Sequence, residues 1–314
     1  MKSFDGARKG ELTEFMRRVR YRLLCSATPS PNDHVELGTL SEALGHLGYM
    51  DMLGQFFTSN EDSLHPAWIG SQWRFKAHAE GDFWRWVASW ARAARKPSDL
   101  GFPDGDFVLP PLDEREHLIA SPVRPGELFA APAQGLSEER EERRATIHAR
   151  CEQAAELLGD ADSAVAWCHL NAEADALVAA MPGAEQVKGG DPDERKEELF
   201  QAFRRGELTR LVTKPKIAAF GLNWQHCARA TYFADHSFEQ YYQAVRRFWR
   251  FGQSRPVRVD VIATEGLAGV VRNMRRKTAA TDKMFATLVA RMNDALILKR
   301  FREHARAQEI PAWL

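Results

Sequence analysis

Short apolar runs alternate with amphipathic stretches along the C-terminal half of the chain. Runs of strand length lie at residues 164–170, 208–213, 230–234 and 257–263. Helical patterns separate them, at 173–180 and over 191–203, where Asp-Pro-Asp-Glu is typical of a helix start. Strands separated by helices of about ten to fifteen residues are typical of parallel βαβ units. The pattern therefore predicts a doubly wound parallel α/β domain over roughly residues 156–265, a fold that binds ligands at the carboxyl ends of its strands.

The N-terminal third has a pattern that predicts helices. Apolar residues recur at helical spacing over 37–57, and residues 82–90 place Phe83, Val87 and Trp90 on one helical face. The tryptophans of this stretch are also candidates for stacking on nucleic-acid bases. A helical insertion that buries its aromatic stripe as core explains them more simply, so we leave them out of the predicted site.

Other segments predict one further strand and the domain boundaries. The apolar run 21–25 stops at Ser-Ala-Thr-Pro-Ser-Pro-Asn-Asp, which indicates a strand that ends in an exposed loop. Residues 96–111 and 120–136 are rich in proline and glycine and indicate loops, and a capped helix is predicted over 137–158. These boundaries divide the chain into four segments. They are a first lobe with a helical insertion at 1–105, a linker with a helix at 106–155, a second lobe at 156–270 and a basic helical tail at 271–314.

Composition is ordinary for a globular protein. The 314 residues are 44% hydrophobic and 27% charged, no apolar run is long enough to span a membrane, and no secretory signal opens the chain, so we expect a cytoplasmic protein. Four widely spaced cysteines form no CxxC pair, which favours buried reduced thiols over a metal site or disulfides.

The formal net charge is zero, but basic residues crowd the end of the chain. Solvated helix faces explain about half of them. The remainder are candidate nucleic-acid contacts, with the best candidates at Arg272, Arg275, Arg276 and Lys277.

The sharpest candidate for chemistry is the segment 243–253, which has the spacing QAxxRxxRxGQ and follows Asp235 by eight residues. On a helix, Gln243, Arg247 and Arg250 lie at i, i+4 and i+7 and share one face, and Gly252 is expected to end that helix. Two guanidiniums on one face can clamp phosphate, because the planar fork binds its oxygens bidentately and stays charged. The simpler alternative is a basic helix with Phe248 and Trp249 in the core.

Two more candidate segments precede residues 243–253 along the chain. Residues 26–29 (Ser-Ala-Thr-Pro) resemble motif III of the Swi/Snf-type branch of the superfamily two helicases and translocases, which includes bacterial and phage members related to the DEAD and DEAH helicases. Residues 221–225 (Gly-Leu-Asn-Trp-Gln) resemble motif V, and 243–253 resembles motif VI. Residues 165–168 are similar to the motif IV region and 108–112 to the linker between the lobes, so the resemblance spans nearly the whole chain.

The resemblance implies a pair of RecA-like lobes that close on ATP and Mg²⁺ while holding nucleic acid, here double-stranded DNA. Arg247 and Arg250 would reach the γ-phosphate as arginine fingers, positioned by Gln243. The residues that would couple the nucleotide state to the bound strand and to lobe movement are Ser26, Ala27, Thr28, Gly221, Asn223, Gln225, Asp235, Gly252 and Gln253.

The resemblance fails where the ATP phosphates should bind. A Walker A loop needs GxxxxGK[ST], and the chain contains no Gly-Lys pair. The Mg²⁺-binding Walker B motif should precede the Ser-Ala-Thr strand, so we expect it just before Lys2, and the first lobe is incomplete. Residues 113–117 (Asp-Glu-Arg-Glu-His) have the wrong spacing and place for it, and we assign them no catalytic role and no metal.

These features predict a chain that does not turn over ATP alone. A split gene with a separate chain that carries the missing segment, a truncated reading frame, and a degenerate binding module are the three explanations. The main hypothesis is the C-terminal motor part of a DNA helicase or translocase. The rival is a non-catalytic module that binds nucleic acid or protein, and the third possibility is a chain that aggregates through an exposed sheet edge.

Overall fold

The computed structural model of the chain forms two compact units. The structure describes residues 7–30, 32–60, 72–121, 133, 135–219 and 221–303. Unit 1 comprises residues 1–106 and 277–314, and unit 2 comprises residues 107–276. The boundary at 120–136 expected from the sequence lies mostly outside the described residues, and the four-segment division remains a prediction.

Unit 2 is built on a six-stranded, fully parallel sheet in the order β3-β8-β7-β4-β6-β5. The chain goes from β4 outward to β5, returns to β6, and then crosses to β7 on the other side of β4. The strands are β3 (Leu112–Ile119), β4 (Ala164–Trp167), β5 (Ala184–Gln186), β6 (Arg210–Thr213), β7 (Arg229–Phe233) and β8 (Val257–Thr264).

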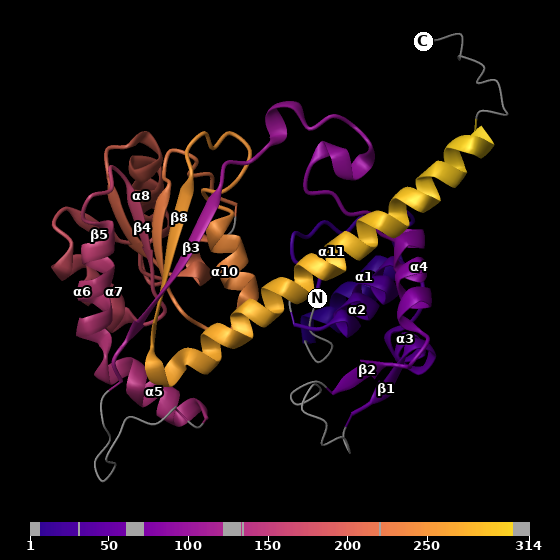
Figure 1. Ribbon diagram of the computed structural model, residues 1–314, viewed down its shortest axis with the longest axis horizontal. Helices are drawn as coiled ribbons and strands as arrows, with labels where there is room; N and C mark the ends of the chain where they lie inside the picture. Colours follow the sequence, from indigo (N-terminus) through magenta and orange to yellow (C-terminus); the bar gives the residue numbers. More distant parts are fainter. Residues whose placement is uncertain are drawn as a thin grey trace. The chain divides into compact units, whose positions relative to one another are not determined.

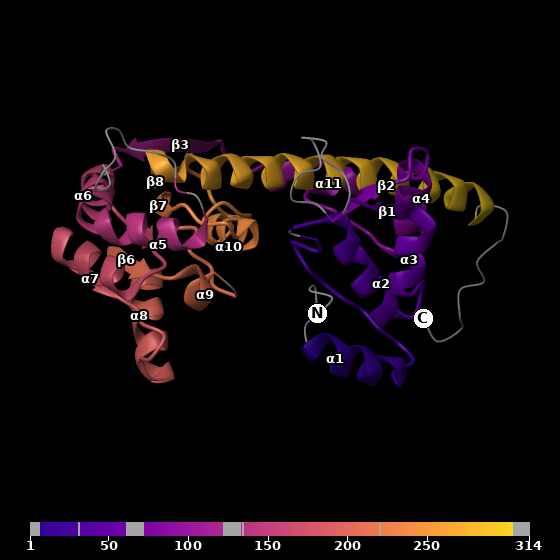
Figure 2. The ribbon, with the colours of Figure 1, turned by 90° about the horizontal axis from the view of Figure 1, so that it is seen from below.

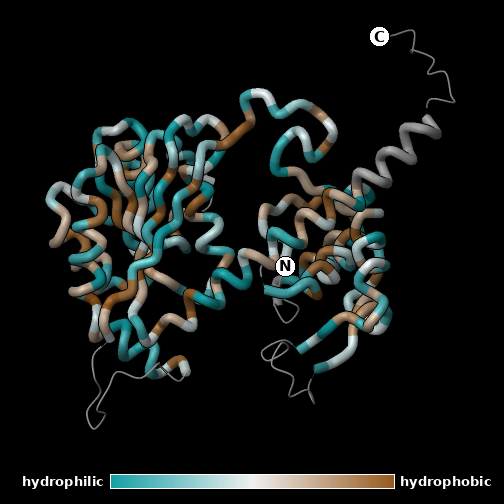
Figure 3. Tube along the Cα trace, viewed as in Figure 1, coloured by the Kyte–Doolittle hydropathy of each residue, from teal (hydrophilic) through white to brown (hydrophobic). Residues whose placement is uncertain are grey.

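Helices cover both faces of this sheet (Figures 1 and 2). On one face, α6 (Ile147–Leu158) and α7 (Asn171–Ala180) bury Cys151, Ala154 and Leu177. On the other lie α8 (Asp193–Arg205), α9 (Pro215–Ala218), α10 (Phe238–Val245) and the start of α11 (Ala268–Glu303), around a core that contains Trp224 and Phe248. The strands between them are rich in apolar residues (Figure 3). The predicted α/β class with a doubly wound parallel sheet is therefore confirmed.

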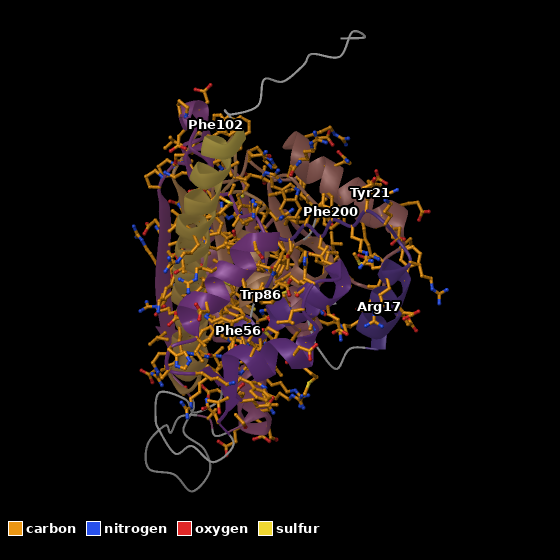
Figure 4. All side chains as sticks on the ribbon, turned by 90° about the vertical axis from the view of Figure 1, so that its right-hand side faces the viewer. Arg17, Tyr21, Phe56, Trp86, Phe102 and Phe200 are labelled. Carbon is orange, nitrogen blue, oxygen red and sulfur yellow. The ribbon has the colours of Figure 1, made fainter. Side chains whose placement is uncertain are left out.

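Unit 1 is mostly helical. Its elements are α1 (Ala7–Arg17), α2 (Leu37–Leu44), α3 (Tyr49–Phe56), α4 (Glu80–Trp90), an antiparallel pair β1 (Phe57–Ser59) and β2 (Trp73–Phe75), and the later part of α11. Phe83 and Val87 are fully buried, and Trp86 stacks on Phe56 at 5.5 Å between ring centroids (Figure 4). The aromatic stripe of α4 is core, as its helical spacing predicted.

Two predicted elements differ from the structure, and one strand was not predicted. Residues 21–25 form no strand: Tyr21 and Leu23 are 80% and 83% exposed, and the described part of unit 1 offers no parallel strand beside them. The helix predicted over 137–158 is broken at Thr146 into α5 (Leu136–Ala145) and α6. The charged run 113–117, for which the sequence predicted no strand, lies inside β3, which pairs with β8 at the edge of the described sheet.

Candidate functional site

The segment 243–253 is not one continuous helix. Ser237 caps the start of α10 by accepting a hydrogen bond from the Gln240 amide, and the helix ends at Val245. Arg247 and Arg250 therefore lie in the turns that follow it, and the predicted i, i+4, i+7 face is wrong beyond Gln243. The chain leaves the helix where the fully buried Phe248 enters the core. Gly252, with φ of 89°, belongs to the next turn and does not end the helix.

Arg247 is buried and is held by neutral acceptors. Its Nη1 donates to the carbonyl oxygen of Leu222 at 2.8 Å, and its Nε donates to the carbonyl of Gln243 at 3.0 Å. Its Nη2 lies 3.4 Å from the Gln243 side-chain oxygen. Burial lowers the pKa of Arg247, and the charge of Arg250 lowers it further.

Arg250 also has a neutral partner. Its Nη1 donates to the side-chain oxygen of Asn223. Within the described residues neither Arg247 nor Arg250 forms an ion pair, although many other arginines do, as Arg150 does with Glu173. Two neighbouring guanidiniums are thus left without a carboxylate to balance their charge.

The structure brings the segments 221–225 and 243–253 together. The Trp224 amide donates to the Arg247 carbonyl at 2.8 Å, and Gln225 Nε2 donates to the Phe251 carbonyl at 3.2 Å. Gln253 is buried and its Nε2 donates to the carbonyl of Cys227 at 2.9 Å. Gly221 has a φ of 76°, a left-handed conformation that glycine adopts without strain.

This cluster lies at the amino ends of the strands, and not at the carboxyl ends where the fold predicted a ligand. Cys227 and Gln253 precede β7 and β8, and Trp249 Nε1 donates to the carbonyl of Pro110, just before β3, at 2.7 Å. The reason is that α10 runs back along the sheet after β7, so the turns that follow it return to the end of the sheet where the strands begin (Figure 1).

Asp235 lies at the carboxyl ends of the strands, the opposite end of the sheet from the arginines, and is not part of their cluster. It follows β7, whose five residues span roughly 13 Å. Its carboxylate lies 3.5 Å from Nδ1 of His169 and 3.7 Å from Nη2 of Arg143. Burial alone would raise the pKa of Asp235, but the charges of His169 and Arg143 and the hydrogen bond from the His236 amide lower it overall.

A network of buried charges that the sequence did not reveal surrounds Asp235. Arg150 and Glu173 form a buried ion pair at 2.7 Å, and Glu173 also accepts the amides of His169 and Leu170 at the start of α7. His169 Nε2 lies 2.8 Å from the carbonyl of Phe233, and burial lowers the pKa of His169. The sequence feature that could have revealed this network is the presence of charged residues at core-facing positions of the predicted helices.

The Ser-Ala-Thr segment belongs to unit 1. Ser26 and Ala27 are exposed, whereas Thr28 is buried and its amide donates to Ser26 Oγ at 3.1 Å.

The basic residues at the start of α11 are partly engaged. Arg272, Arg275 and Arg276 are exposed, but Arg275 pairs with Glu116 of β3 and Arg276 donates to Asn273 at 3.0 Å. Lys277 donates to Asn32 at 3.0 Å.

Within the described ranges, the structure contains no group of three or more His, Cys, Asp or Glu side chains placed to hold a metal. None of the helices described is both long and apolar enough to cross a membrane.

No protein-family model matches the chain, and no curated protein does. Among solved structures it is similar to the C-terminal part of the Fun30 ATPase domain, with a TM-score of 0.36 and 14% identity over 45% of this chain and 47% of that one. It is also similar to an S. cerevisiae Dbp5 variant bound to Gle1, with a TM-score of 0.38 and 13% identity over 52% and 39% of the two chains. The chain spans less than half of each matched chain. Similarities of this extent carry no argument about function, which therefore rests on the residues themselves.

Proposed function

We propose that the chain is the C-terminal motor part of an ATP-dependent helicase or translocase of the Swi/Snf type, acting on double-stranded DNA. Arg247 and Arg250 would contact the γ-phosphate of ATP. The observation that carries this proposal is the pair of guanidiniums that has no carboxylate partner among the described residues and is hydrogen-bonded to Leu222, Gln243 and Asn223.

A polyphosphate is the kind of ligand that would balance the charge of these two guanidiniums. Burying a cation beside another cation is unfavourable, and an anion bound between them offsets that cost. The guanidinium fork binds phosphate oxygens bidentately and stabilises the charge that develops as the γ-phosphoryl group leaves. Gln243 accepts hydrogen bonds from Arg247, and Asn223 accepts one from Arg250, so both side chains are oriented before the ligand arrives.

The remaining residues of the motifs would transmit the nucleotide state. Gln225 and Gln253 form hydrogen bonds that connect the segments resembling motifs V and VI. A movement of the arginines would therefore displace both segments. Gly221 and Gly252 supply the turns. In unit 1, the Ser-Ala-Thr segment at 26–28 would couple hydrolysis to lobe movement. In unit 2, Asp235 would help to hold the structure at the carboxyl end of β7.

The chain itself supplies no phosphate cradle. It contains no Gly-Lys pair, and its described part offers no cluster of metal ligands, so no step of this proposal runs through a metal that this chain binds. In this proposal a separate chain would supply both ATP-binding motifs.

The test is ATP hydrolysis by the purified, folded chain, with and without DNA, alone and mixed with a chain that carries the two ATP-binding motifs. We expect no turnover alone, turnover in the mixture, and loss of that turnover in both Arg247→Ala and Arg250→Ala. Arg205→Ala, which removes an exposed arginine paired with Glu207 on α8, is the matched control and should retain full activity. Turnover that survives in both arginine variants would refute the assignment.

A binding module without catalysis is the second candidate, because exposed Arg272 and Arg276 on α11 have no carboxylate partner within the described residues. Double-stranded DNA affinity that falls steeply with salt, and that weakens uniformly across sequences when both are changed to Gln, would favour it. Arg205→Gln, at an exposed arginine of α8 that pairs with Glu207 and is not among the candidate contacts, is the control.

A further inference from the structure

Two phenylalanines form an exposed stack beside the arginine pair. The rings of Phe107 and Phe251 lie 4.7 Å apart between centroids with an interplanar angle of 23°, and the residues are 50% and 55% exposed. Phenylalanine is among the residues most often buried, so two stacked rings that both face solvent are unusual. Neither belongs to the two hydrophobic cores of unit 2.

Hydrogen bonds on both sides hold this aromatic pair in place. Trp249 Nε1 donates to the carbonyl of Pro110, which fixes the segment that carries Phe107. Gln225 Nε2 donates to the carbonyl of Phe251 itself. The pair is thus a preformed surface whose rings do not have to be ordered when a ligand arrives.

The aromatic pair adjoins polar groups of a particular kind. Phe251 directly follows Arg250, whose guanidinium contacts Asn223, and the side chains of Asn223 and Gln225 carry amide donors on the same segment. A flat apolar surface, side-chain amides and guanidiniums are the three elements that recognise a base and its phosphates.

We infer that Phe251 and Phe107 form the platform on which the purine base of a bound nucleotide stacks. This inference rests on the proposed function, because it concerns the same nucleotide whose phosphates would contact Arg247 and Arg250. The base lies against the exposed ring faces, where aromatic stacking removes apolar surface from water, and the exposed side chain of Asn223 supplies an amide for its polar edge.

The surroundings favour a mononucleotide over a nucleic-acid strand. A strand needs cations that follow the backbone along a groove. Near the aromatic pair, Arg255 is engaged by Asp162 and by the carbonyl of His226, and Arg246 lies over the rings of Tyr242 and Trp249. Arg247 and Arg250, which have no carboxylate partner in the described part of the chain, are two adjacent cations, a number that suits one short polyphosphate.

The test separates the base from the phosphates by using adenosine and inorganic tripolyphosphate as two probes. Saturation-transfer NMR should show the strongest contact at the base protons of adenosine. Phe251→Leu and Phe107→Leu should each weaken adenosine binding about fivefold or more, while leaving tripolyphosphate binding unchanged. Phe102→Leu, at a phenylalanine of unit 1 that is 56% exposed, is the matched control and should bind adenosine normally.

Other results would overturn the inference. Adenosine that binds equally well to both variants, or that does not bind at all, removes the platform. So does binding of a single-stranded oligothymidine that depends on Phe251 when adenosine binding does not. Failure of the proposed function is a different result: tripolyphosphate would then bind equally well to the unchanged chain and to Arg250→Ala.

Discussion

The guanidinium of Arg247 donates a 2.8 Å hydrogen bond to the carbonyl oxygen of Leu222, which precedes it by 25 residues. The Arg247 carbonyl in turn accepts the amide of Trp224 at the same distance. The two segments that resemble motifs V and VI are therefore joined in both directions through one residue. Because Arg247 is buried at this junction, its side chain has a structural role in addition to the proposed catalytic one.

We expect Arg247→Ala and Arg250→Ala to differ in stability although both abolish the proposed activity. Arg247→Ala leaves the acceptors of Leu222 and Gln243 without their donor, which should lower the free energy of unfolding by about 1–3 kcal/mol. Arg250→Ala removes one contact to an exposed Asn223 and should cost less than about 1 kcal/mol. Urea unfolding of both variants checks this, and equal losses would contradict the structural role of Arg247.

The buried ion pair between Arg150 and Glu173 should be the most sensitive charged contact in unit 2. Glu173→Ala leaves Arg150 buried without its carboxylate and removes the acceptor for two amides at the start of α7, so we expect a loss of about 3–5 kcal/mol. The matched change is Glu185→Ala, which breaks an exposed pair with Arg195 and should change stability by less than about 1 kcal/mol. A small effect of Glu173→Ala in urea unfolding would show that the network relaxes without cost.

The sequence predicted β4, β6 and β7 because their side chains are buried on both faces and form short apolar runs. It predicted β8 because apolar and charged residues alternate at its start. The same reasoning missed β3, because four of the eight residues in Leu112–Ile119 are charged and lie in a row. Every side chain of this edge strand is half-buried or exposed, so charged residues are tolerated there and the apolar pattern is lost. The very short β5 was missed because three residues give no pattern.

The opposite error occurred at residues 21–25, where an apolar run predicted a strand that does not form. A strand requires a neighbour to accept its hydrogen bonds, and a local pattern cannot reveal whether one is present. The candidate site shows the same limit. Spacing made Arg247 and Arg250 candidates, but their partners Leu222 and Asn223 depend on how distant segments pack. The helix that was expected to hold both arginines ends at Val245.

Thiol reactivity should separate one cysteine from the other three. Cys25 is exposed, contrary to the expectation that all four are buried, whereas Cys151, Cys168 and Cys227 are buried. Burial raises the pKa of Cys151 to about 12 and that of Cys227 to about 11, so their reactive thiolate forms are scarce near neutral pH. We expect one rapid alkylation in the native protein and four after denaturation, counted by mass spectrometry. Rapid native labelling of Cys151 would contradict the packing of α6 on the sheet.

The last prediction concerns acid pH and His169. Because burial lowers the pKa of His169 below its ordinary value of 6.5 in spite of the nearby Asp235 and Glu173, the unfolded chain binds a proton more readily than the folded one. The stabilising contribution of neutral His169 is therefore complete above pH 6.5 and is lost as the pH falls from 6.5 through the lower pKa of the folded state.

His34 and His226 also have lowered pKa values, so the contribution of His169 must be isolated by difference. His169→Gln keeps a donor toward the carbonyl of Phe233 and cannot be protonated, so its unfolding free energy should fall less steeply between pH 6.5 and pH 5 than that of the unchanged chain. The carboxylate of Asp235 does not interfere in this window, because its lowered pKa lies below 3.8. Identical slopes in urea unfolding at these pH values would mean that His169 titrates alike in the folded and unfolded chains, and that its burial at the end of β4 has no electrostatic consequence.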